Sequence, residues 1–271
     1  MILVTGATAN VGRMVVDELL ALGATEVRAL TVDPARAALP AGVEVVRGHL
    51  GRLSAVAGAL TGVEKVYLAP APSSAAAFSR LAADSGVRHI VDMSGPKGEH
   101  WQAVEDGVEA SGVPFTHLEP GEFMANGLLW APQIRAGDDV LDAFPEVVNA
   151  PIAQEDIAAV AARVLLAEPR TGGSHMGRSY VLTGPVALSR KEKVREIGAA
   201  LGRPLRYVEL TGDAARAHFA SVMGEHGDWY LDGLAALASS PQPATSTVHD
   251  LLGRPAMSYR EWASRHADQF R

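Results

Sequence analysis

Cysteine is absent from the 271 residues of this chain, which excludes disulfide bonds, thiolate metal sites and cysteine nucleophiles. No apolar run reaches the roughly 18 residues that a membrane-spanning helix needs. No block of basic residues is long enough to follow a phosphate backbone, and acidic residues outnumber basic residues by 31 to 24. We therefore expect that neither a membrane nor a nucleic acid is a partner of this protein.

Apolar residues occur instead in short, regularly spaced runs, and they make up 48% of the chain, enough for a sizeable core. In the first half, runs of strand length alternate with segments of helical periodicity. The predicted strands cover residues 2–5, 26–30, 43–48, 65–70, 89–95 and 114–121, and the predicted helices cover 11–23, 33–39, 53–63, 75–87 and 101–113. This alternation predicts βαβ units and an α/β fold with a doubly wound parallel sheet.

The first strand leads into a glycine-rich turn, "TGATANVGR", at the start of the first helix. Gly6, Ala9 and Gly12 have the spacing of a dinucleotide-binding loop, with alanine where a middle glycine is usual. The helix that follows offers unpaired N–H groups and the positive end of its dipole to a pyrophosphate. The other residues of this loop that we expect to hold a cofactor are Thr8, Asn10, Val11 and Arg13.

After about residue 125 the alternation of strands and helices becomes irregular. We expect residues 1–125 to form the dinucleotide-binding half. Residues 126–271 are predicted to form a smaller C-terminal α+β part that binds the substrate, with some segments returning to the main sheet. Two predicted helices of this part begin with capping boxes, one pairing Ser189 with Glu192 and the other pairing Ser258 with Glu261.

Several stretches together resemble the NmrA-like family of atypical short-chain dehydrogenases. They are "ILVTGATANVGRMVVDELLALG", "VRALTVDPARA", "VEVVRGHLGRLSAVAGALTGVEKVYL", "ASGVPFTHLEPGEFMAN" and "DIAAVAARVLL". The resemblance implies a Rossmann domain with a small C-terminal substrate part. It also implies NADP or NAD as the cofactor. Members of this family include NAD(P)H-dependent quinone and related reductases, and redox-sensing regulators that bind the cofactor without turning it over.

The chain departs from this family just after the second predicted strand. NADPH-using members commonly carry an arginine where this chain has Val32, so a bidentate ligand of the 2′-phosphate is missing. Arg13 and Arg36 are candidates to replace it. Asp33 has two interpretations, either binding a ribose hydroxyl, which favours NAD, or capping the short helix that follows.

Two further departures concern charged positions. Relatives have an acid where this chain has His49, and they have "LRPG" where this chain has "LEPG", which places Glu119 in the predicted lining. Other residues that we expect to contact the cofactor follow the third predicted strand or end the fourth: Leu50, Ala69 and Pro70.

The segment "MSGPKGEHW" occupies the region where dehydrogenases of the short-chain type carry a Tyr-x-x-x-Lys pair, which we do not find there. Met93, Ser94 and Gly95 are predicted to end the fifth strand and face a nicotinamide. Lys97 and His100 are the candidate catalytic residues, Lys97 to hold the ribose or polarise a carbonyl and His100 to donate a proton. The alternative is that both are solvated loop residues.

The segment "EPGEFMANGLLW" is the predicted wall of the substrate cleft. Its candidate residues are Glu119, Glu122, Phe123, Asn126 and Trp130. The two glutamates have alternatives: a carboxylate pair with a raised pKa, exposed side chains, or pairing with an arginine. The apolar residues of the segment have core packing as an alternative role.

The remaining chemistry-bearing residues match no other motif. The nine histidines are scattered without a metal-binding spacing, so we predict no metal site, and no G-x-S-x-G elbow supports a hydrolase. The leading prediction is an NAD(P)H-dependent oxidoreductase that transfers hydride to a small, flat, carbonyl- or quinone-type molecule. The alternatives are a cofactor-sensing regulator without turnover and a redox-silent enzyme on the same scaffold.

The location and assembly of the protein follow from weaker signals. The chain opens directly with a predicted strand and has no basic segment before it, so we expect no signal peptide and a cytoplasmic protein. We expect a small-molecule substrate and a monomer or homodimer.

Overall fold

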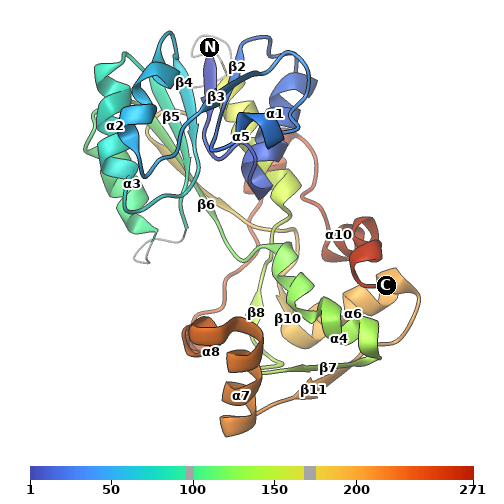
Figure 1. The fold of residues 1–271 in the computed structure, drawn as a ribbon. Helices are drawn as coiled ribbons and strands as arrows, with labels where there is room; N and C mark the ends of the chain where they lie inside the picture. The colour runs from blue at the N-terminus through green and yellow to red at the C-terminus, as the bar shows by residue number, and fades with distance from the viewer. Residues whose placement is uncertain (96–100, 168–174) are drawn as a thin grey trace. The chain divides into compact units, whose positions relative to one another are not determined.

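The computed structural model describes residues 1–95, 101–167 and 175–271 (Figure 1). Its internal contacts divide the chain into two compact units. The first unit consists of Met1–Pro120, Gln154–Leu182 and Thr247–Arg254, and the second consists of Gly121–Ala153, Thr183–Ser246 and Pro255–Arg271. The boundary that we expected at residues 125 and 126 stays a prediction.

A seven-stranded sheet forms the centre of the first unit, with the strand order β3-β2-β1-β4-β5-β6-β9. Every neighbouring pair in this sheet is parallel, so the carboxyl ends of the strands lie along one edge. The strands are β1 (Ile2–Val4), β2 (Val27–Thr31), β3 (Glu44–Arg47), β4 (Lys65–Leu68), β5 (His89–Met93), β6 (Phe115–Pro120) and β9 (Arg178–Leu182). The predicted α/β class is confirmed. The order reverses between β1 and β4, where doubly wound sheets open a ligand crevice.

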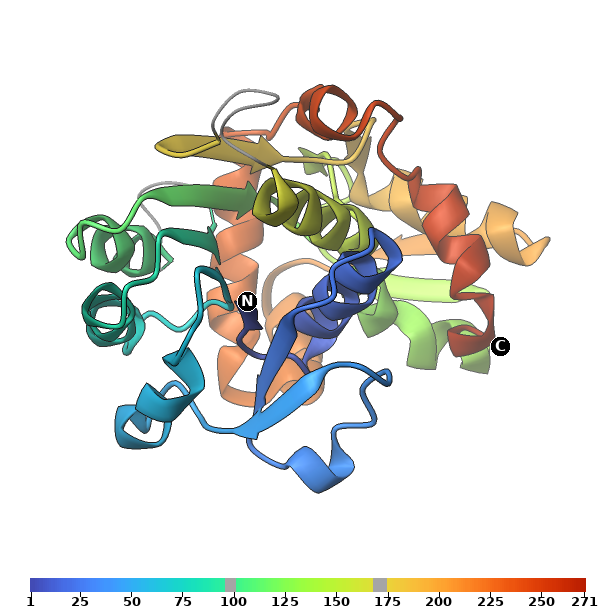
Figure 2. The same ribbon diagram turned by 90° about the horizontal axis from the view of Figure 1, so that it is seen from above.

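Helices cover both faces of this sheet (Figures 1 and 2). On one face α1 (Asn10–Ala21) packs against α5 (Gln154–Leu166), and on the other α2 (Ala75–Asp84) packs against α3 (Gln102–Glu109). The apolar stripe of α1 is buried, and alanines fill much of α5, which lets the two helices approach closely. The short helix α9 (Thr247–Leu252) packs against α5 and β9.

Two segments expected to be helices form only short 3₁₀ turns. Residues 53–63 give η2 (Leu53–Ala55) and η3 (Ala57–Leu60), and residues 33–39 give η1 (Pro34–Arg36). Glycine lowers helix propensity at position 58, and Gly62 has a positive φ of 73° that ends the segment.

The second unit combines helices with two small sheets. β8 pairs antiparallel with β10, and β7 pairs in parallel with β11. The elements are η4 (Met124–Trp130), α4 (Ala131–Ala136), β7 (Asp139–Asp142), β8 (Val148–Asn149), β10 (Leu188–Ser189), α6 (Arg190–Leu201), β11 (Arg206–Glu209), α7 (Gly212–Met223), η5 (Gly224–His226), α8 (Gly227–Ser239), α10 (Tyr259–Arg265) and η6 (Ala267–Gln269). The core of this unit surrounds Trp262, which is fully buried.

Serine caps begin two of these helices. Ser189 and Glu192 form the complete predicted capping box of α6, in which each side chain bonds the other residue's N–H group. At α10, the Ser258 side chain accepts the N–H of Glu261 at 3.2 Å.

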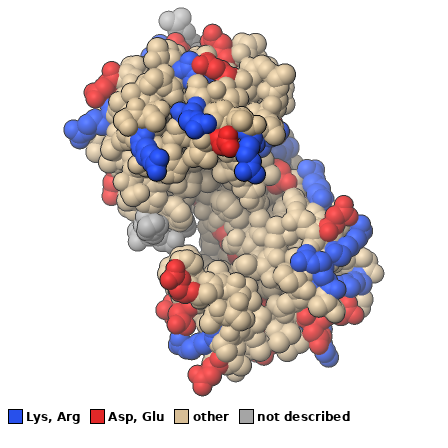
Figure 3. All heavy atoms as spheres, in the orientation of Figure 1, with Lys and Arg blue, Asp and Glu red and all other residues tan. Residues whose placement is uncertain are grey.

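The described part of the chain contains no helix that is long and apolar enough to cross a membrane. On the face drawn in Figure 3, basic and acidic side chains are interspersed rather than gathered into one patch of a single sign.

Candidate functional site

The loop between β1 and α1 is built so tightly that only glycine fits at its ends. Gly6 has a φ of 60°, and a Cβ at Gly12 would lie 2.2 Å from the carbonyl oxygen of Gly6. Thr5 ties this loop to the end of β4, because its hydroxyl donates to the carbonyl of Tyr67 and accepts the N–H of Ala69 at 2.8 Å. The loop therefore lies at the reversal point of the strand order.

The N-terminus of α1 has the features of a pyrophosphate site. Ala9 occupies the N-cap position with extended backbone angles, and within the described residues no side chain caps the helix. The N–H groups of the first turn are thus left to a ligand, and the helix dipole favours a negative one. Thr8, Ala9 and Asn10 are exposed beside this turn, whereas Val11 is buried. These N–H groups fit the pyrophosphate of a dinucleotide. The methyl group of Ala9 forms no hydrogen bond with them.

The candidate cofactor residues near the end of β2 differ in whether another residue of the chain binds their side chains. Val32 is 59% exposed, and Asp33 caps η1 by accepting the N–H of Ala35 at 3.2 Å. Arg13 forms an ion pair with Asp17 at 3.0 Å and donates to the carbonyl of Ala38. Arg36 is exposed and has no ion pair or side-chain hydrogen bond within the described residues. Of the two arginines considered for a 2′-phosphate, Arg36 is therefore the one whose guanidinium is available.

The other predicted cofactor residues of the first unit follow the carboxyl ends of β3 and β4. His49 is exposed, and its Nδ1 accepts the N–H of Gly51 at 3.0 Å. Leu50 is half-buried against the core beneath the sheet. Ala69 and Pro70 are half-buried, and Ala69 packs where a side chain on Gly6 would collide with it. Parallel pairing thus brings these residues to the same edge as the glycine loop.

The end of β5 is more deeply buried than expected. Met93 is 7% exposed and accepts the hydroxyl of Tyr67 on its sulfur at 3.6 Å. Ser94 is 6% exposed and donates its hydroxyl to Glu105 at 2.6 Å, and Gly95 is packed against Trp101. Lys97 and His100 lie outside the described residues, so their catalytic roles stay predictions.

A buried carboxylate–histidine pair that the sequence analysis did not predict lies on β5 and β6. Asp92 on β5 and His117 on β6 are register partners, and their side chains bond at 2.6 Å. His117 also contacts Glu109 of α3 at 3.3 Å. Burial raises the pKa of Asp92 to about 6, although the bond to His117 acts in the opposite direction. The signal in the sequence was the presence of polar residues within two strands that are otherwise apolar.

The predicted substrate residues fall into both units. Glu119 is on β6 in the first unit and is 4% exposed. Glu122, Phe123, Asn126 and Trp130 belong to the second unit, where Phe123 makes a parallel bridge to Ile152. The predicted pairing of the Glu119 and Glu122 carboxylates stays a prediction.

Glu122 is bound by a lysine, not by the arginine considered as an alternative. Lys193 of α6 donates to it at 2.6 Å and to Asn149 at 2.5 Å, and Asn149 also donates to Glu122. Burial disfavours the charged form of Glu122, but the charges of Lys193 and Arg190 outweigh it and lower the pKa of this carboxyl group. A raised pKa is therefore wrong for Glu122.

Trp130 is part of a second buried ionic group rather than a pocket wall. Its indole N–H donates to Asp142 at 2.8 Å, and Arg190 binds the same carboxylate. The guanidinium of Arg190 lies 5.2 Å from the Trp130 ring centre and 5.8 Å from that of Tyr230. Arg190 is the first residue of α6 and is 2% exposed.

A pocket of about 500 Å³ opens next to this group, within the second unit. Its lining comes from η4 and from the α7–α8 region: Ala125, Asn126, Leu128, Leu129, Met223, Trp229 and Tyr230. Asn126 is thus the predicted substrate residue that lines a pocket. The sequence analysis missed Met223, Trp229 and Tyr230, although "DWY" places two aromatic residues together in the chain, in the first turn of α8.

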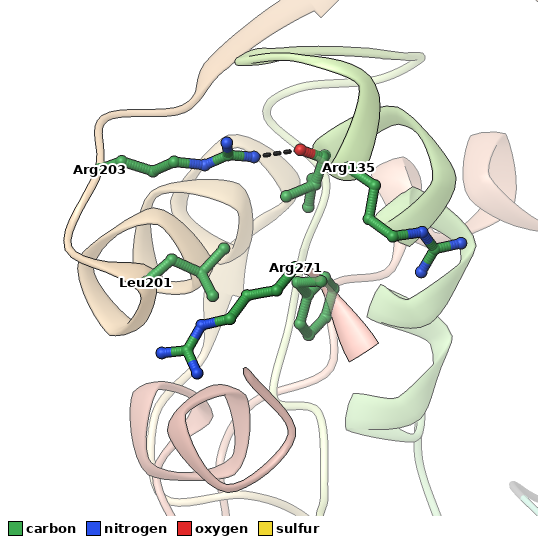
Figure 4. Close-up of a pocket in the computed structure, with 6 residues that line it drawn as sticks. Arg135, Leu201, Arg203 and Arg271 are labelled. Atoms are coloured by element: carbon green, nitrogen blue, oxygen red, sulfur yellow. Dashed lines mark hydrogen bonds between the residues drawn. The ribbon is translucent and has the colours of Figure 1, made fainter. Parts of the chain in front are cut away.

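A second, smaller pocket of about 120 Å³ is lined by three arginines, Arg135, Arg203 and Arg271 (Figure 4). Their charged groups do not converge. Arg203 donates to the carbonyl of Ile134, Arg135 to that of Gln269, and Arg271 to Asp268. This pocket is therefore lined by arginine stems and apolar side chains, and it does not have the arrangement of an anion site.

The described residues contain no group of three His, Asp or Glu side chains that could hold a metal ion. The class that the fold and the glycine loop define is a Rossmann-type, NAD(P)-dependent protein with a small second unit.

Comparison with known proteins agrees with this class. Residues 6–168 match the model of an NAD(P)H-binding family, and the chain belongs to that family. It is 37% identical to a (4-alkanoyl-5-oxo-2,5-dihydrofuran-3-yl)methyl phosphate reductase of Streptomyces griseus, over 100% of this chain and 99% of the relative. It is 34% identical to an NAD(P)H azoreductase of Xenophilus azovorans, with the same coverage.

A solved structure extends the similarity to three dimensions. The NADPH-dependent quinone oxidoreductase of Escherichia coli, in complex with NADPH, matches with a TM-score of 0.87 and 26% identity, over 98% of this chain and 100% of the other. The resemblance to atypical, NmrA-like short-chain dehydrogenases is confirmed. The chain thus belongs to a family that binds NAD(P)H, and the relatives that it matches are NAD(P)H-dependent reductases.

Proposed function

We propose that this protein reduces a small, flat, conjugated carbonyl or quinone by hydride transfer from NAD(P)H. The observation that carries the proposal is the 500 Å³ pocket of the second unit, with Trp229 and Tyr230 beside Asn126. Two aromatic side chains and an amide suit a flat acceptor, since the rings stack on it and the amide orients its carbonyl oxygen.

The chain's own residues have distinct tasks in this proposal. The N–H groups at the start of α1 bind the pyrophosphate, and Gly6 and Gly12 keep the loop close enough to reach it. Met93, Ser94 and Gly95 hold the end of β5, where we expect the nicotinamide to bind. The buried bond from Ser94 to Glu105 fixes that strand end.

NAD(P)H supplies a hydride, that is, two electrons and one proton, when it is bound. A quinone that accepts this hydride needs one further proton to become a hydroquinone, and the cofactor is left oxidised. Solvent, Lys97 or His100 is the source of the second proton in this proposal. Because the cofactor performs the difficult step, the absence of a Tyr-x-x-x-Lys pair near β5 does not oppose a reductase.

The first experiment is a titration of the full chain with NADPH and with NADH, followed by nicotinamide fluorescence and calorimetry. Cofactor oxidation is then measured with 1,2-naphthoquinone and with an azo dye. Binding together with oxidation of NAD(P)H that depends on the acceptor supports the proposal. Binding without turnover of any acceptor would favour a cofactor-sensing regulator, and absence of binding up to millimolar cofactor would favour a redox-silent enzyme.

A further inference from the structure

The pocket of the second unit is uncharged across its whole lining, although charged side chains surround it. All seven lining residues are neutral at pH 7, and they include the exposed indole of Trp229, which is 71% accessible. The charged residue that precedes Trp229 in the chain, Asp228, is paired with Arg216 at 3.0 Å. The ligand therefore meets aromatic rings, aliphatic side chains and one amide, but no formal charge from these residues.

Two buried cations of this unit are already paired with carboxylates. Arg190 lies behind Tyr230, with Nη1 at 3.4 Å from the tyrosine hydroxyl, and its charge is balanced by Asp142. Lys193 is balanced by Glu122 at 2.6 Å. Both cationic side chains are nearly inaccessible, at 3% and 1% exposed. Two positive and two negative groups thus cancel, and neither cation is left to receive an anionic ligand.

We propose that this pocket selects neutral, flat ring systems and discriminates against the same rings when they carry a sulfonate or phosphate group. This inference rests on the proposed function and specifies its substrate. An anionic group that enters the pocket loses water and gains no cation from the seven residues that line it, which disfavours its binding. The formal net charge of −7 opposes anions at longer range as well.

The inference separates this chain from a relative that is similar over its whole length. The Streptomyces griseus reductase, 37% identical, is named for a compound that carries a phosphate ester. A pocket for such an ester needs a cation or several N–H donors that face the phosphate. In the described lining of this pocket, Asn126 is the one side chain with an amide, and no cation is present. We therefore expect the two proteins to differ in substrate charge.

The test compares two ligands of the same ring that cannot be reduced, 2-naphthol and 2-naphthalenesulfonate. Each is titrated into the full chain in the presence of oxidised cofactor, by calorimetry and by quenching of tryptophan fluorescence. We expect 2-naphthol to bind at least about tenfold more tightly than the sulfonate, a difference of about 1.4 kcal/mol. Equal or tighter binding of the sulfonate would overturn the inference, and so would the absence of binding of both ligands.

A charge added to the lining gives a second, independent measurement. Leu129→Lys, or Asn126→Lys if the first variant does not fold, places an ammonium group in the pocket. The sulfonate should then bind at least about tenfold more tightly than it binds the unaltered protein. Leu141→Lys is the matched control, because Leu141 is 37% exposed on β7 of the same unit and does not line the pocket. An equal gain in the control would show that the effect is not local, and would overturn the inference.

Failure of this inference can be distinguished from failure of the proposed function. Reduction of 1,2-naphthoquinone and of its 4-sulfonate is measured in parallel with NAD(P)H. Turnover of both acceptors at similar kcat/KM contradicts charge selection but leaves the reductase proposal intact. Selective binding of 2-naphthol without NAD(P)H oxidation by any acceptor supports a neutral pocket and contradicts the reductase proposal.

Discussion

Arg190 and Asp142 form an ion pair in which both side chains are almost inaccessible, at 3% and 1% exposed. Nε and Nη2 of Arg190 donate to the same carboxylate oxygen that accepts the indole N–H of Trp130. Trp130 ends η4, and Tyr230, on the other side of the guanidinium, belongs to α8. The pair thus joins two elements that line the neutral pocket, and it gives the second unit a fixed centre.

Replacing Arg190 with methionine should destabilise the protein by about 3 to 5 kcal/mol, because Asp142 is left as an uncompensated buried charge. Adding Asp142→Asn should recover part of this loss, since the amide is neutral and its oxygen still accepts the indole N–H of Trp130. Urea unfolding of the single and double variants measures the difference. Arg206→Met is the control, because its pair with Asp139 is exposed to solvent and should contribute little to stability. A double variant that is less stable than Arg190→Met would contradict this account.

Ala9→Asp should change stability and cofactor binding in opposite directions. An aspartate at this uncapped N-cap position can accept the first N–H groups of α1, which should stabilise the protein by about 0.5 to 2 kcal/mol. The same carboxylate occupies the N–H groups that we assign to the pyrophosphate and repels it, so NADPH should bind at least about tenfold more weakly. Thermal unfolding and NADPH titration measure the two effects. Ala9→Ser is the neutral control, expected to stabilise the helix with a smaller loss of affinity, and unchanged NADPH binding in Ala9→Asp would place the cofactor elsewhere.

Arg36 should determine how well the protein distinguishes NADPH from NADH. Its exposed guanidinium has no partner within the described residues, whereas Arg13 is held by Asp17 and Ala38. We expect Arg36→Ala to weaken NADPH binding about tenfold or more, and to leave NADH binding nearly unchanged, because only NADPH carries the 2′-phosphate. Paired titrations of both cofactors measure this ratio. Arg80→Ala, which removes an exposed arginine on α2, is the control, and an equal loss for both cofactors would exclude the role.

His89 should make the protein less stable in mild acid. Burial, assisted by the charge of Lys65, lowers the pKa of this histidine to about 4, and its Nε2 bonds the hydroxyl of Thr116 at 2.9 Å. The unfolded chain has a histidine pKa near 6.5, so it binds the proton more readily than the folded protein does. The stabilising contribution is present above pH 6.5 and is lost as the pH falls to about 4, with a size of about 3 kcal/mol.

His89→Gln keeps a hydrogen-bonding group and removes the titration, so it should reduce the loss of stability between pH 6.5 and 4. The measurement is urea unfolding of both proteins at several pH values in that window. The buried Asp92–His117 pair is common to both proteins and cancels in the difference. Parallel stability curves for the two proteins would contradict the assignment.

The sequence analysis was most successful where structure depends on local order along the chain. The spacing of Gly6, Ala9 and Gly12, the alternating apolar segments and the Ser189 capping box are local patterns, and each has a direct steric or hydrogen-bonding meaning. They predicted correctly the parallel α/β sheet and the tight turn between β1 and α1. The 53–63 segment failed as a helix, because its apolar pattern did not outweigh glycine at two positions.

The candidate site depends on contacts that local sequence patterns do not predict. Asn126 was predicted as a substrate residue and lines the pocket, but Trp229 and Tyr230 lie about a hundred residues further along the chain. Glu122 was assigned to the same wall, and its partner Lys193 is 71 residues away. No spacing rule connects such residues, because their contact depends on how whole elements pack.

The sequence alone determined the class of this protein, since a strand, a glycine turn and a helix N-terminus must be contiguous to hold a pyrophosphate. Tertiary structure decided which charges are free. Folding pairs Arg190 with Asp142 and Lys193 with Glu122, and leaves Arg36 exposed. A charged residue acts on a ligand only if no other charge neutralises it, and that depends on distances in the folded chain.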